Sequence, residues 1–342
     1  MDQVVSEQVS VRTTAAPSVA IGFDIGHSAV KLAWLGEHGT PLSLLFRSCV
    51  RPAFAISNEE TAQRARAETV VCNGQMYFFG ETAAIQSEPG GANGLIADWV
   101  ESVEYRVLVS AATAQLESAG VRVGDALVVC GLPTSQFGRH GTKLAALMRE
   151  VTGAREVQVK PQPMGAYQYV RLTDRGGASG QIRPGENWGV IDIGRYSTDF
   201  MAMMGTSWVE RAADSCGGFR LVAGHLKTLL VERGLDVDDD DCDTAAFEGT
   251  VRQFGRTVDV SAEAREAVRR ATTEITDVAL RVLGPFSKKL DGVLVAGGAA
   301  GVFIEGIRAI FPHARDVQHG RIAIAEGFRR LGAGILRARQ LP

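Results

Sequence analysis

The stretch VIDIGRYSTDFMAM, residues 190–203, decides how we interpret this chain. An apolar strand runs into Asp192 and Gly194, and hydrophobic alternation resumes after a polar turn. This pattern predicts a strand, a turn that fits a phosphate group, and a second strand. Gly194 lets the backbone bend and approach a ligand. Ser197 and Thr198 can add hydroxyl donors, and Asp192 at the strand end can hold a metal ion through water.

The same pattern occurs once more near the N-terminus, as IGFDIGHSAVKLAW at residues 21–34. Here Asp24 and Gly26 repeat the aspartate and glycine of the later stretch, so two similar halves are expected to face one another. Lys31 has two interpretations. It can be an ordinary outward-facing strand lysine, or its ammonium can reach a phosphate held in the turn. The duplicated motif favours the phosphate contact.

Composition narrows the class of protein. The 342 residues are 45% hydrophobic and 22% charged, which is typical of a soluble globular chain long enough for two domains. No apolar run is long enough to cross a bilayer, and no secretory signal precedes residue 18, so a cytoplasmic location is expected. The net charge of −3, with acids and bases interleaved, predicts no direct nucleic-acid contact. The five cysteines include no C-x-x-C pair and are interpreted as reduced thiols.

A polar, glycine-rich stretch at residues 173–187 separates the two halves. The predicted parts, in chain order, are a flexible tail at 1–18, a first lobe at 19–172 with an inserted subdomain at about 47–93, a second lobe at 188–324, and a C-terminal helix at 325–342 that returns to the first lobe. Short strands are expected in the insertion, on either side of the turn pair Asn73-Gly74.

Helical spacing predicts helices at 95–118 and 322–336, among others. A strand at 157–159 is expected to end in the segment PQPMGAY, residues 161–167, and another strand is expected at 209–213 before a turn at 215–219.

Six aspartates lie between residues 236 and 243. A calcium-binding loop requires glycine at its sixth position, where Asp241 stands, and glutamate at its twelfth, where Phe247 stands. The run is therefore predicted to be a solvated acidic loop.

A third glycine-rich turn is the sequence VLVAGGAAG, residues 293–301. A strand, glycines and a helix can indicate a dinucleotide site, with Asp316 at a suitable distance for a ribose, or can serve only strand-to-helix packing. Ala296 stands where that fingerprint needs its first glycine. Beside the two Asp-Ile-Gly turns, we interpret Gly297 and Gly298 as a place where a nucleoside approaches the backbone. No Walker, G-x-S-x-G or H-E-x-x-H motif occurs.

These three turns, in this order, resemble those of the actin, DnaK-type chaperone and sugar kinase superfamily. The segment CGLPTSQF at residues 130–137 is similar to one common in the ParM/StbA actin-like ATPases of plasmid segregation. The resemblance covers residues 19 to about 334. It implies an α/β fold of two lobes, each a mixed sheet flanked by helices, with ATP or ADP and Mg²⁺ in the central cleft. It also implies ATP hydrolysis coupled to self-assembly into filaments, linked to plasmid DNA by a DNA-binding adaptor.

By this resemblance Asp24 and Asp192 organise the magnesium ion through water. The residues that it assigns to nucleotide binding are Gly26, His27, Ser28, Lys31, Gly194, Arg195, Tyr196, Ser197, Thr198, Gly217, Gly218, Gly297, Gly298 and Ala299. Arg195 and Tyr196 depart from the small residues usual in the second turn, and His27 is larger than usual in the first. The second turn therefore has to accommodate two bulky side chains.

The resemblance also gives Gln162 a catalytic role, at the position where related proteins carry a glutamate or glutamine that orients the attacking water. Its other interpretation is a polar loop residue between Pro161 and Pro163. An amide cannot accept a proton at neutral pH, so the implied role is positioning and not general-base catalysis.

Two rival functions stay open at this stage. A small-molecule kinase of the same superfamily would need a carboxylate aimed at a substrate hydroxyl, and no obvious candidate stands in the first half. The other is a nucleotide-binding scaffold that neither polymerises nor hydrolyses. Sequence does not decide between ATP and GTP.

Overall fold

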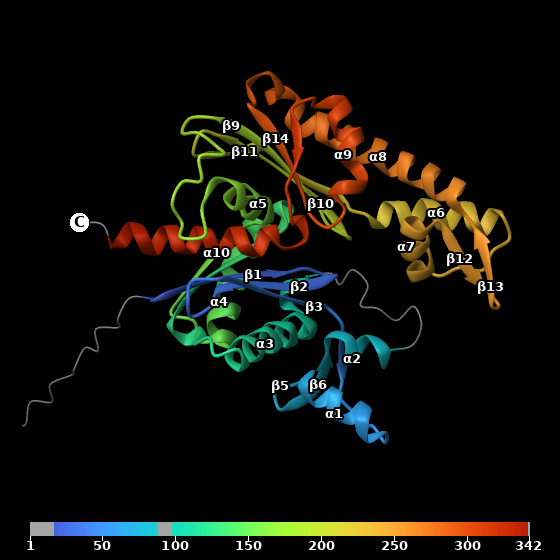
Figure 1. Ribbon diagram of the computed structural model, residues 1–342, viewed down its shortest axis with the longest axis horizontal. Helices are drawn as coiled ribbons and strands as arrows, with labels where there is room; N and C mark the ends of the chain where they lie inside the picture. Colours follow the sequence, from blue (N-terminus) through green and yellow to red (C-terminus); the bar gives the residue numbers. More distant parts are fainter. Residues whose placement is uncertain (1–16, 88–97, 341–342) are drawn as a thin grey trace, which may run out of the picture.

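The computed structural model describes residues 17–87 and 98–340, and the expected tail at 1–18 lies almost entirely outside these residues. Within the described chain, two mixed sheets of five strands lie on either side of helix α10 (Gly320–Arg339), as Figure 1 shows. Helices cover the outer face of each sheet. This architecture confirms the expected two-lobed α/β fold.

The first sheet has the strand order β3-β2-β1-β7-β8. Its strands are β1 (Val19–Ile25), β2 (Ala29–Leu35), β3 (Pro41–Arg47), β7 (Ala126–Leu132) and β8 (Glu156–Pro161). The first three form an antiparallel meander, and β7 and β8 are parallel to β1. Every residue of β7 is buried, as expected of a central strand covered on both faces.

The second sheet repeats this plan with the order β11-β10-β9-β14-β15. Its strands are β9 (Asn187–Ile193), β10 (Ser197–Met204), β11 (Ser207–Gly217), β14 (Gly292–Ala296) and β15 (Ala314–Asp316). Again a meander is followed by two parallel strands. The repeated aspartate-glycine motifs therefore lie at equivalent turns of equivalent sheets, β1–β2 and β9–β10.

The helices of the first lobe are α3 (Val103–Ser118) and α4 (Thr134–Thr152), and those of the second are α6 (Arg220–Glu232), α8 (Ser261–Leu283) and α9 (Ala300–Ile310). Between the lobes, α5 (Gln162–Arg171) packs against α10, and residues of both sheets join them in a shared apolar core around Tyr167 and Phe328. In the described residues no helix combines the length and apolar character needed to cross a bilayer.

Each lobe carries a smaller unit at its outer end (Figure 1). The first contains β4 (Val50–Pro52), α1 (Glu59–Ala67), β5 (Thr69–Cys72), β6 (Gln75–Phe79) and α2 (Gly80–Ile85). The second contains α7 (Asp239–Glu248) and the hairpin of β12 (Thr250–Gln253) and β13 (Arg256–Asp259). The helices α1 and α2 were not predicted. Asn58 caps the start of α1 by accepting a hydrogen bond from the Thr61 amide. This capping residue was overlooked because the surrounding segment has no clear hydrophobic period.

Three further segments differ from the sequence-based expectation. The strand expected at 157–159 ends at Pro161 as predicted, but the rest of the segment is helical, because α5 begins at Gln162, where Pro163 fits the first turn. Strand β11 is longer than 209–213 and continues through the expected turn to Gly217. The helix expected at 95–118 begins only at Val103, where Ser102 caps it, and is preceded by the short 3₁₀ helix η1 (Trp99–Glu101).

Helix α10 lies unusually close to its neighbours because it carries small residues on the contact face. A Cβ at Gly327 would lie 1.7 Å from the carbonyl oxygen of Gly165 in α5, so only glycine fits there. The helix begins at Gly320, and the expected division at 324/325 falls inside it.

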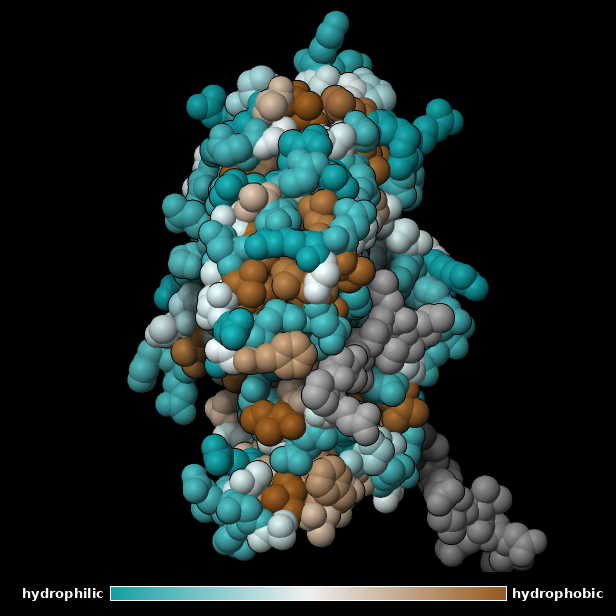
Figure 2. All heavy atoms as spheres, turned by 90° about the vertical axis from the view of Figure 1, so that its right-hand side faces the viewer, coloured by the Kyte–Doolittle hydropathy of each residue, from teal (hydrophilic) through white to brown (hydrophobic). Residues whose placement is uncertain are grey.

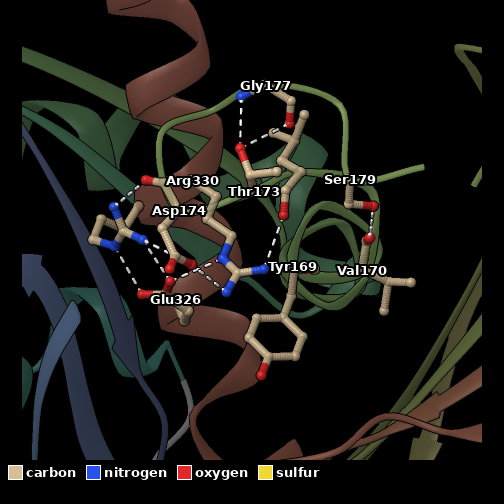
Figure 3. Close-up of polar contacts among 10 residues, drawn as sticks. Tyr169, Val170, Thr173, Asp174, Gly177, Ser179, Glu326 and Arg330 are labelled. Atoms are coloured by element: carbon tan, nitrogen blue, oxygen red, sulfur yellow. Dashed lines mark hydrogen bonds and ion pairs between the residues drawn. The ribbon is translucent and has the colours of Figure 1, made fainter. Parts of the chain in front are cut away.

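The connection between the lobes is held by two arginines of α10. Arg330 donates to the backbone carbonyls of Tyr169 and Leu172 and pairs with Asp174 at 2.6 Å, while its guanidinium lies over the Tyr169 ring, as Figure 3 shows. The neighbouring Arg329 is fully buried and pairs with Glu326. The glycine-rich segment that sequence patterns identified as a boundary is thus anchored at its start.

Candidate nucleotide-binding site

The two glycine turns have the same backbone geometry. Gly26 donates its amide to the carbonyl of Ala29 at 3.2 Å, and Gly194 donates its amide to the carbonyl of Ser197 at 2.8 Å. Each turn connects the first two strands of its sheet at the end that faces the other lobe, and both turns line one narrow cavity of about 80 Å³. Two copies of one local motif therefore meet across the space between the lobes.

Carboxylates form the floor of this inner cavity. Asp24 and Asp192 are both buried at the ends of β1 and β9. Asp24 pairs with Lys31, which stands opposite it on β2, at 2.7 Å. At the equivalent place opposite Asp192, β10 carries Asp199. The first turn thus has a carboxylate facing an ammonium, whereas the second has two facing carboxylates.

This excess of buried negative charge favours a bound cation. Burial, together with the nearby carboxylates of Asp199 and Asp24, raises the pKa of Asp192 to about 7, and Lys31 opposes the shift only in part. A divalent cation would favour the ionised form of these groups. Carboxylates are ligands that Mg²⁺ prefers, directly or through water, so the donor set fits that ion.

Asp199 also joins the lobes. Its Oδ1 accepts from the Thr134 amide at 2.7 Å, at the start of α4 in the first lobe, and from the Ser215 hydroxyl at 2.6 Å. Ser197 donates to its Oδ2 at 2.9 Å. Burial raises the pKa of Asp199, and these hydrogen bonds counteract the shift. Sequence reasoning missed Asp199, although it follows Asp192 at the same interval as Lys31 follows Asp24.

Gln162 is the first residue of α5, and only 9% of it is exposed. Its Nε2 donates to Asp24 Oδ1 at 2.8 Å, and the residue lines the inner cavity. Because the amide nitrogen is used in this bond, the amide carbonyl is the atom that remains to accept a hydrogen bond from water.

The inner cavity opens into an outer pocket of about 570 Å³. Ser28, Lys31, Gly194 and Arg195 line both spaces. The outer pocket is also lined by Phe219 and by side chains of α7, the most apolar of which is Phe247. Pockets of this size and mixed character accommodate small-molecule ligands.

The two phenylalanines at the outer pocket stack on each other, with ring centroids 4.5 Å apart and 18° between the ring planes. Arg321 and Ala299 lie at the same pocket. Sequence reasoning missed Phe219, Phe247 and Arg321, because nothing in the local sequence around them signals a binding role.

The structure distributes the predicted site residues over three places. The inner cavity brings together Asp24, Gly26, His27, Ser28, Lys31, Gln162, Asp192, Gly194, Arg195, Tyr196, Ser197, Gly297 and Gly298. Ala299 lines the outer pocket. Thr198, Gly217 and Gly218 line neither space. The Thr198 hydroxyl donates to Gly217 O at 3.0 Å and the Gly218 amide to Tyr196 O at 3.1 Å, so they support the second turn from behind.

The third glycine turn lies beside the second. Gly297 has a φ of +93°, and a Cβ there would lie 2.2 Å from the Ile193 carbonyl oxygen. No other residue satisfies both the backbone angle and this close approach. The glycine therefore holds the end of β14 directly against the Asp192 strand.

The bulky residues of the two turns point in different directions. The ring of His27 stacks on Trp99 at 4.4 Å and also faces Tyr196, at 5.7 Å, so aromatic side chains of the two lobes meet. Arg195 turns outward to α7, where it pairs with Asp243 and, at 3.0 Å, with Asp240. The turn accommodates its large residues by directing them away from its backbone.

These contacts correct the prediction that residues 236–243 form a solvated loop. The run instead begins α7, where the Asp238 and Asp241 side chains cap the first turn reciprocally. Carboxylates are favourable at a helix N-terminus, and Arg195, Arg220 and Lys227 neutralise several of them. The acidic run is therefore one wall of the outer pocket.

We expect Arg195→Ala to lower the free energy of unfolding of the second lobe by about 1 kcal/mol. Burial raises the pKa of Asp243 while the Arg195 guanidinium opposes the shift, so removing the arginine leaves a half-buried carboxylate without its partner. The measurement is chemical unfolding of the variant beside Arg195→Ala/Asp243→Asn. If the double variant is no more stable than the single one, the ion pair does not hold α7.

A larger cavity, of about 920 Å³, lies at the far end of β1 and α10. It is lined by Trp34, Arg122 and Arg337 among others, and none of the three glycine turns reaches it. The glycine turns and the buried Asp24 and Asp192 therefore converge on the smaller cleft and not on this cavity.

Comparison with known proteins agrees with this geometry. Residues 22–165 match the family model of the N-terminal domain of actin-like proteins. The whole fold is similar to a ParM filament structure from Clostridium botulinum, with a TM-score of 0.74 and 17% identity over 92% of this chain and 98% of that chain. The chain has the actin-like fold.

Two further solved structures have the same fold as this chain. A non-polymerisable quadruple mutant of pCBH ParM superposes with a TM-score of 0.71 and 17% identity, over 92% of this chain and 98% of that one. The archaeal actin homologue Ta0583, in complex with ADP, superposes with a TM-score of 0.67 and 16% identity, over 94% of this chain and all of that one. No curated protein matches the sequence. At these identities the structural likeness shows the fold.

Proposed function

We propose that this actin-like protein binds and hydrolyses ATP in the cleft between its lobes, with Mg²⁺, and assembles with itself into nucleotide-dependent filaments. The observation that carries the proposal is the meeting of both glycine turns, the buried carboxylates of Asp24 and Asp192, and Gln162 in one cavity. The ADP complex of the archaeal homologue and the ParM filament structure support it by likeness.

In this proposal the nucleoside occupies the outer pocket and the phosphates enter the inner cavity. Lys31, at the border of the two spaces, contacts a phosphate, and Asp24 and Asp192 hold the magnesium ion through water. The ion supplies charge neutralisation to the phosphates. Gln162 orients the attacking water through its free carbonyl oxygen, while Asp24 fixes its amide nitrogen.

The cellular role that we propose is segregation of plasmid DNA in the cytoplasm, with a DNA-binding adaptor as the link between filament and DNA. The resemblance to ParM supports this role. The adaptor is a necessary part of it, because the net charge of −3 offers no broad basic face to DNA.

The deciding experiment is sedimentation of the full chain with Mg²⁺ and ATP, GTP, ADP or no nucleotide, with phosphate release measured on the same samples. We expect pelleting and phosphate release with a triphosphate, and no pelleting with ADP. Phosphorylation of a small hydroxyl compound without pelleting would instead identify a kinase. Nucleotide binding with neither pelleting nor phosphate release would identify a scaffold.

Surface hydrophobicity suggests where copies of the chain meet. Figure 2 shows the end of the molecule that carries the β12–β13 hairpin, where hydrophobic side chains form separate patches among hydrophilic ones. Phe254 at the tip of this hairpin is 98% exposed. An aromatic ring fully exposed to water gains free energy when a second copy covers it.

We therefore expect Phe254→Ser to raise the protein concentration needed for pelleting by roughly fivefold, equivalent to about 1 kcal/mol of lost apolar burial. Phosphate release at a concentration below assembly should not change. Val231→Ser, which alters an exposed apolar residue of α6 in the same lobe, is the control. Equal pelleting by the Phe254 variant and the wild type would remove the hairpin tip from the proposed contact.

A further inference from the structure

A second polar cluster lies outside the nucleotide cleft, where η1 meets α4 in the first lobe. It consists of Asp98 and Glu101, at the two ends of η1, and His140 of α4. Only 7% of the His140 side chain is exposed, whereas both carboxylates reach solvent. The Nδ1 atom of His140 is buried and has no hydrogen-bond partner. Such a buried, unpaired ring nitrogen is costly unless a ligand satisfies it.

Both carboxylates face the imidazole without bonding to it. His140 Nε2 lies 3.8 Å from Asp98 Oδ1, and Nδ1 lies 3.7 Å from Glu101 Oε1. These separations are too long for hydrogen bonds. One ligand atom from each of the three residues lies within 4.8 Å of the others. An ion with bonds of about 2.1 Å holds its ligand atoms about 3–4 Å apart, so the cluster needs to contract only slightly around a metal.

We propose that Asp98, Glu101 and His140 bind a divalent transition-metal ion of the Zn²⁺ class, with water in the remaining coordination positions. One imidazole nitrogen and two carboxylate oxygens are ligands that suit Zn²⁺, Mn²⁺ or Co²⁺. Mg²⁺ and Ca²⁺ prefer sites made of oxygen alone, so they bind here less well. The site is separate from the proposed magnesium position, because neither the inner nor the outer nucleotide space is lined by these three residues.

One nearby cation competes with the metal. The Lys143 ammonium pairs with Glu101 Oε1. An ion that binds Glu101 through this oxygen has to displace the ammonium, and one that binds through the other oxygen is still repelled by it. Removing the lysine charge should therefore tighten metal binding, a result that a purely structural cluster would not produce.

The cluster also has a built-in reporter. Trp99 lies between the two carboxylates in sequence, its ring stacks on His27 at 4.4 Å, and its Nε1 donates to the Ile25 carbonyl at 3.5 Å. An ion that draws Asp98 and Glu101 toward His140 changes the surroundings of this indole. Metal binding is therefore expected to change tryptophan fluorescence, and Trp99→Phe should abolish that change while leaving binding intact.

The test is titration of the chelator-treated full chain with Zn²⁺ by calorimetry, with Co²⁺ absorption as a second measurement. We expect one ion per chain at this site, a Co²⁺ spectrum without a thiolate band, and no displacement by equimolar Mg²⁺. His140→Gln and Asp98→Asn should each weaken binding by at least about 10-fold, which is the lower end of what even outer-shell changes cost metal sites. Lys143→Met should tighten it.

The matched control is His225→Gln, which removes a histidine that pairs with a single carboxylate, Glu274, at 2.6 Å. It should leave the ion affinity unchanged. Unfolding curves in chelator show whether each variant folds, and Asp98→Asn alters an exposed side chain, so it tests the site even if His140→Gln does not fold. Wild-type affinity in the Asp98 variant, or loss of the ion in the His225 variant, would overturn the proposal.

Discussion

Asp192→Ala is expected to reduce magnesium-dependent ATP hydrolysis by at least about 100-fold, because neutralisation of phosphate charge carries most of the catalysis in such reactions. In the structure this carboxylate stands at the end of β9, buried beside Asp24 and Asp199. No other described acidic group of the second lobe both lines the inner cavity and ends the strand that leads into the glycine turn.

The measurement is phosphate release at saturating ATP and Mg²⁺, with nucleotide affinity determined on the same preparation. Asp24→Ala should show a loss of similar size, because the two aspartates occupy equivalent turns. Asp316→Ala, which removes an exposed carboxylate at the end of β15, should retain activity. Hydrolysis by the Asp192 variant within a few-fold of the wild type would show that the second turn is only structural.

Stability can be separated from chemistry in this experiment. Burial and the neighbouring carboxylates disfavour the ionised form of Asp192, as its pKa of about 7 indicates. Replacing it with asparagine keeps the volume and removes the charge, so Asp192→Asn is not expected to unfold the protein. If the asparagine variant folds but does not hydrolyse ATP, the loss of activity comes from catalysis and not from unfolding.

The parts of the fold that sequence predicted are those encoded locally. The two Asp-Ile-Gly motifs predicted two strand-turn-strand units, and the structure has both, with the same hydrogen bond closing each turn. Apolar and polar residues that alternate on both sides of a glycine are sufficient to predict such an element. The third turn at Gly297 followed from the same kind of local signal.

The parts that sequence missed depend on contacts between distant residues. Helix α7 begins in an acidic run that resembles solvated chain until Arg195, more than forty residues earlier, is seen to pair with Asp240 and Asp243. Helix α5 was concealed by prolines on both sides of Gln162, although Pro163 fits the first turn of a helix. The outer pocket combines Phe219 with Phe247 and Arg321, which no local pattern brings together.

Repetition could have supplied one of the missing residues. Lys31 and Asp199 occupy the same register position, opposite Asp24 and Asp192 respectively. Comparing the two repeats position by position identifies Asp199 as a buried group at the site. The comparison also shows that the repeats carry opposite charges at this position, with an ammonium opposite Asp24 and a carboxylate opposite Asp192.

Gln162→Ala is expected to slow ATP hydrolysis by roughly 10-fold or more, in keeping with the loss of one contact that positions the attacking water. The side chain enters the cavity from the start of α5, and its amide nitrogen is fixed by Asp24 at 2.8 Å. This bond orients the carbonyl oxygen, which is the only atom of the amide able to accept a hydrogen bond from water. The residue does not accept the proton, so its removal should lower the rate without changing the affinity for ATP.

Filaments of the Gln162→Ala variant should consequently last longer after assembly, because hydrolysis that precedes disassembly is slower. Phosphate release, nucleotide affinity and the decay of pelleted protein are measured on one preparation. Gln168→Ala is the matched control, since Gln168 lies on the same helix and is buried away from the cavity, beside Met164. Gln162→Glu distinguishes positioning from packing, because a carboxylate retains an acceptor oxygen but loses the bond that donates to Asp24. If affinity falls as far as rate in Gln162→Ala, or if the rate does not change, Gln162 does not position the water.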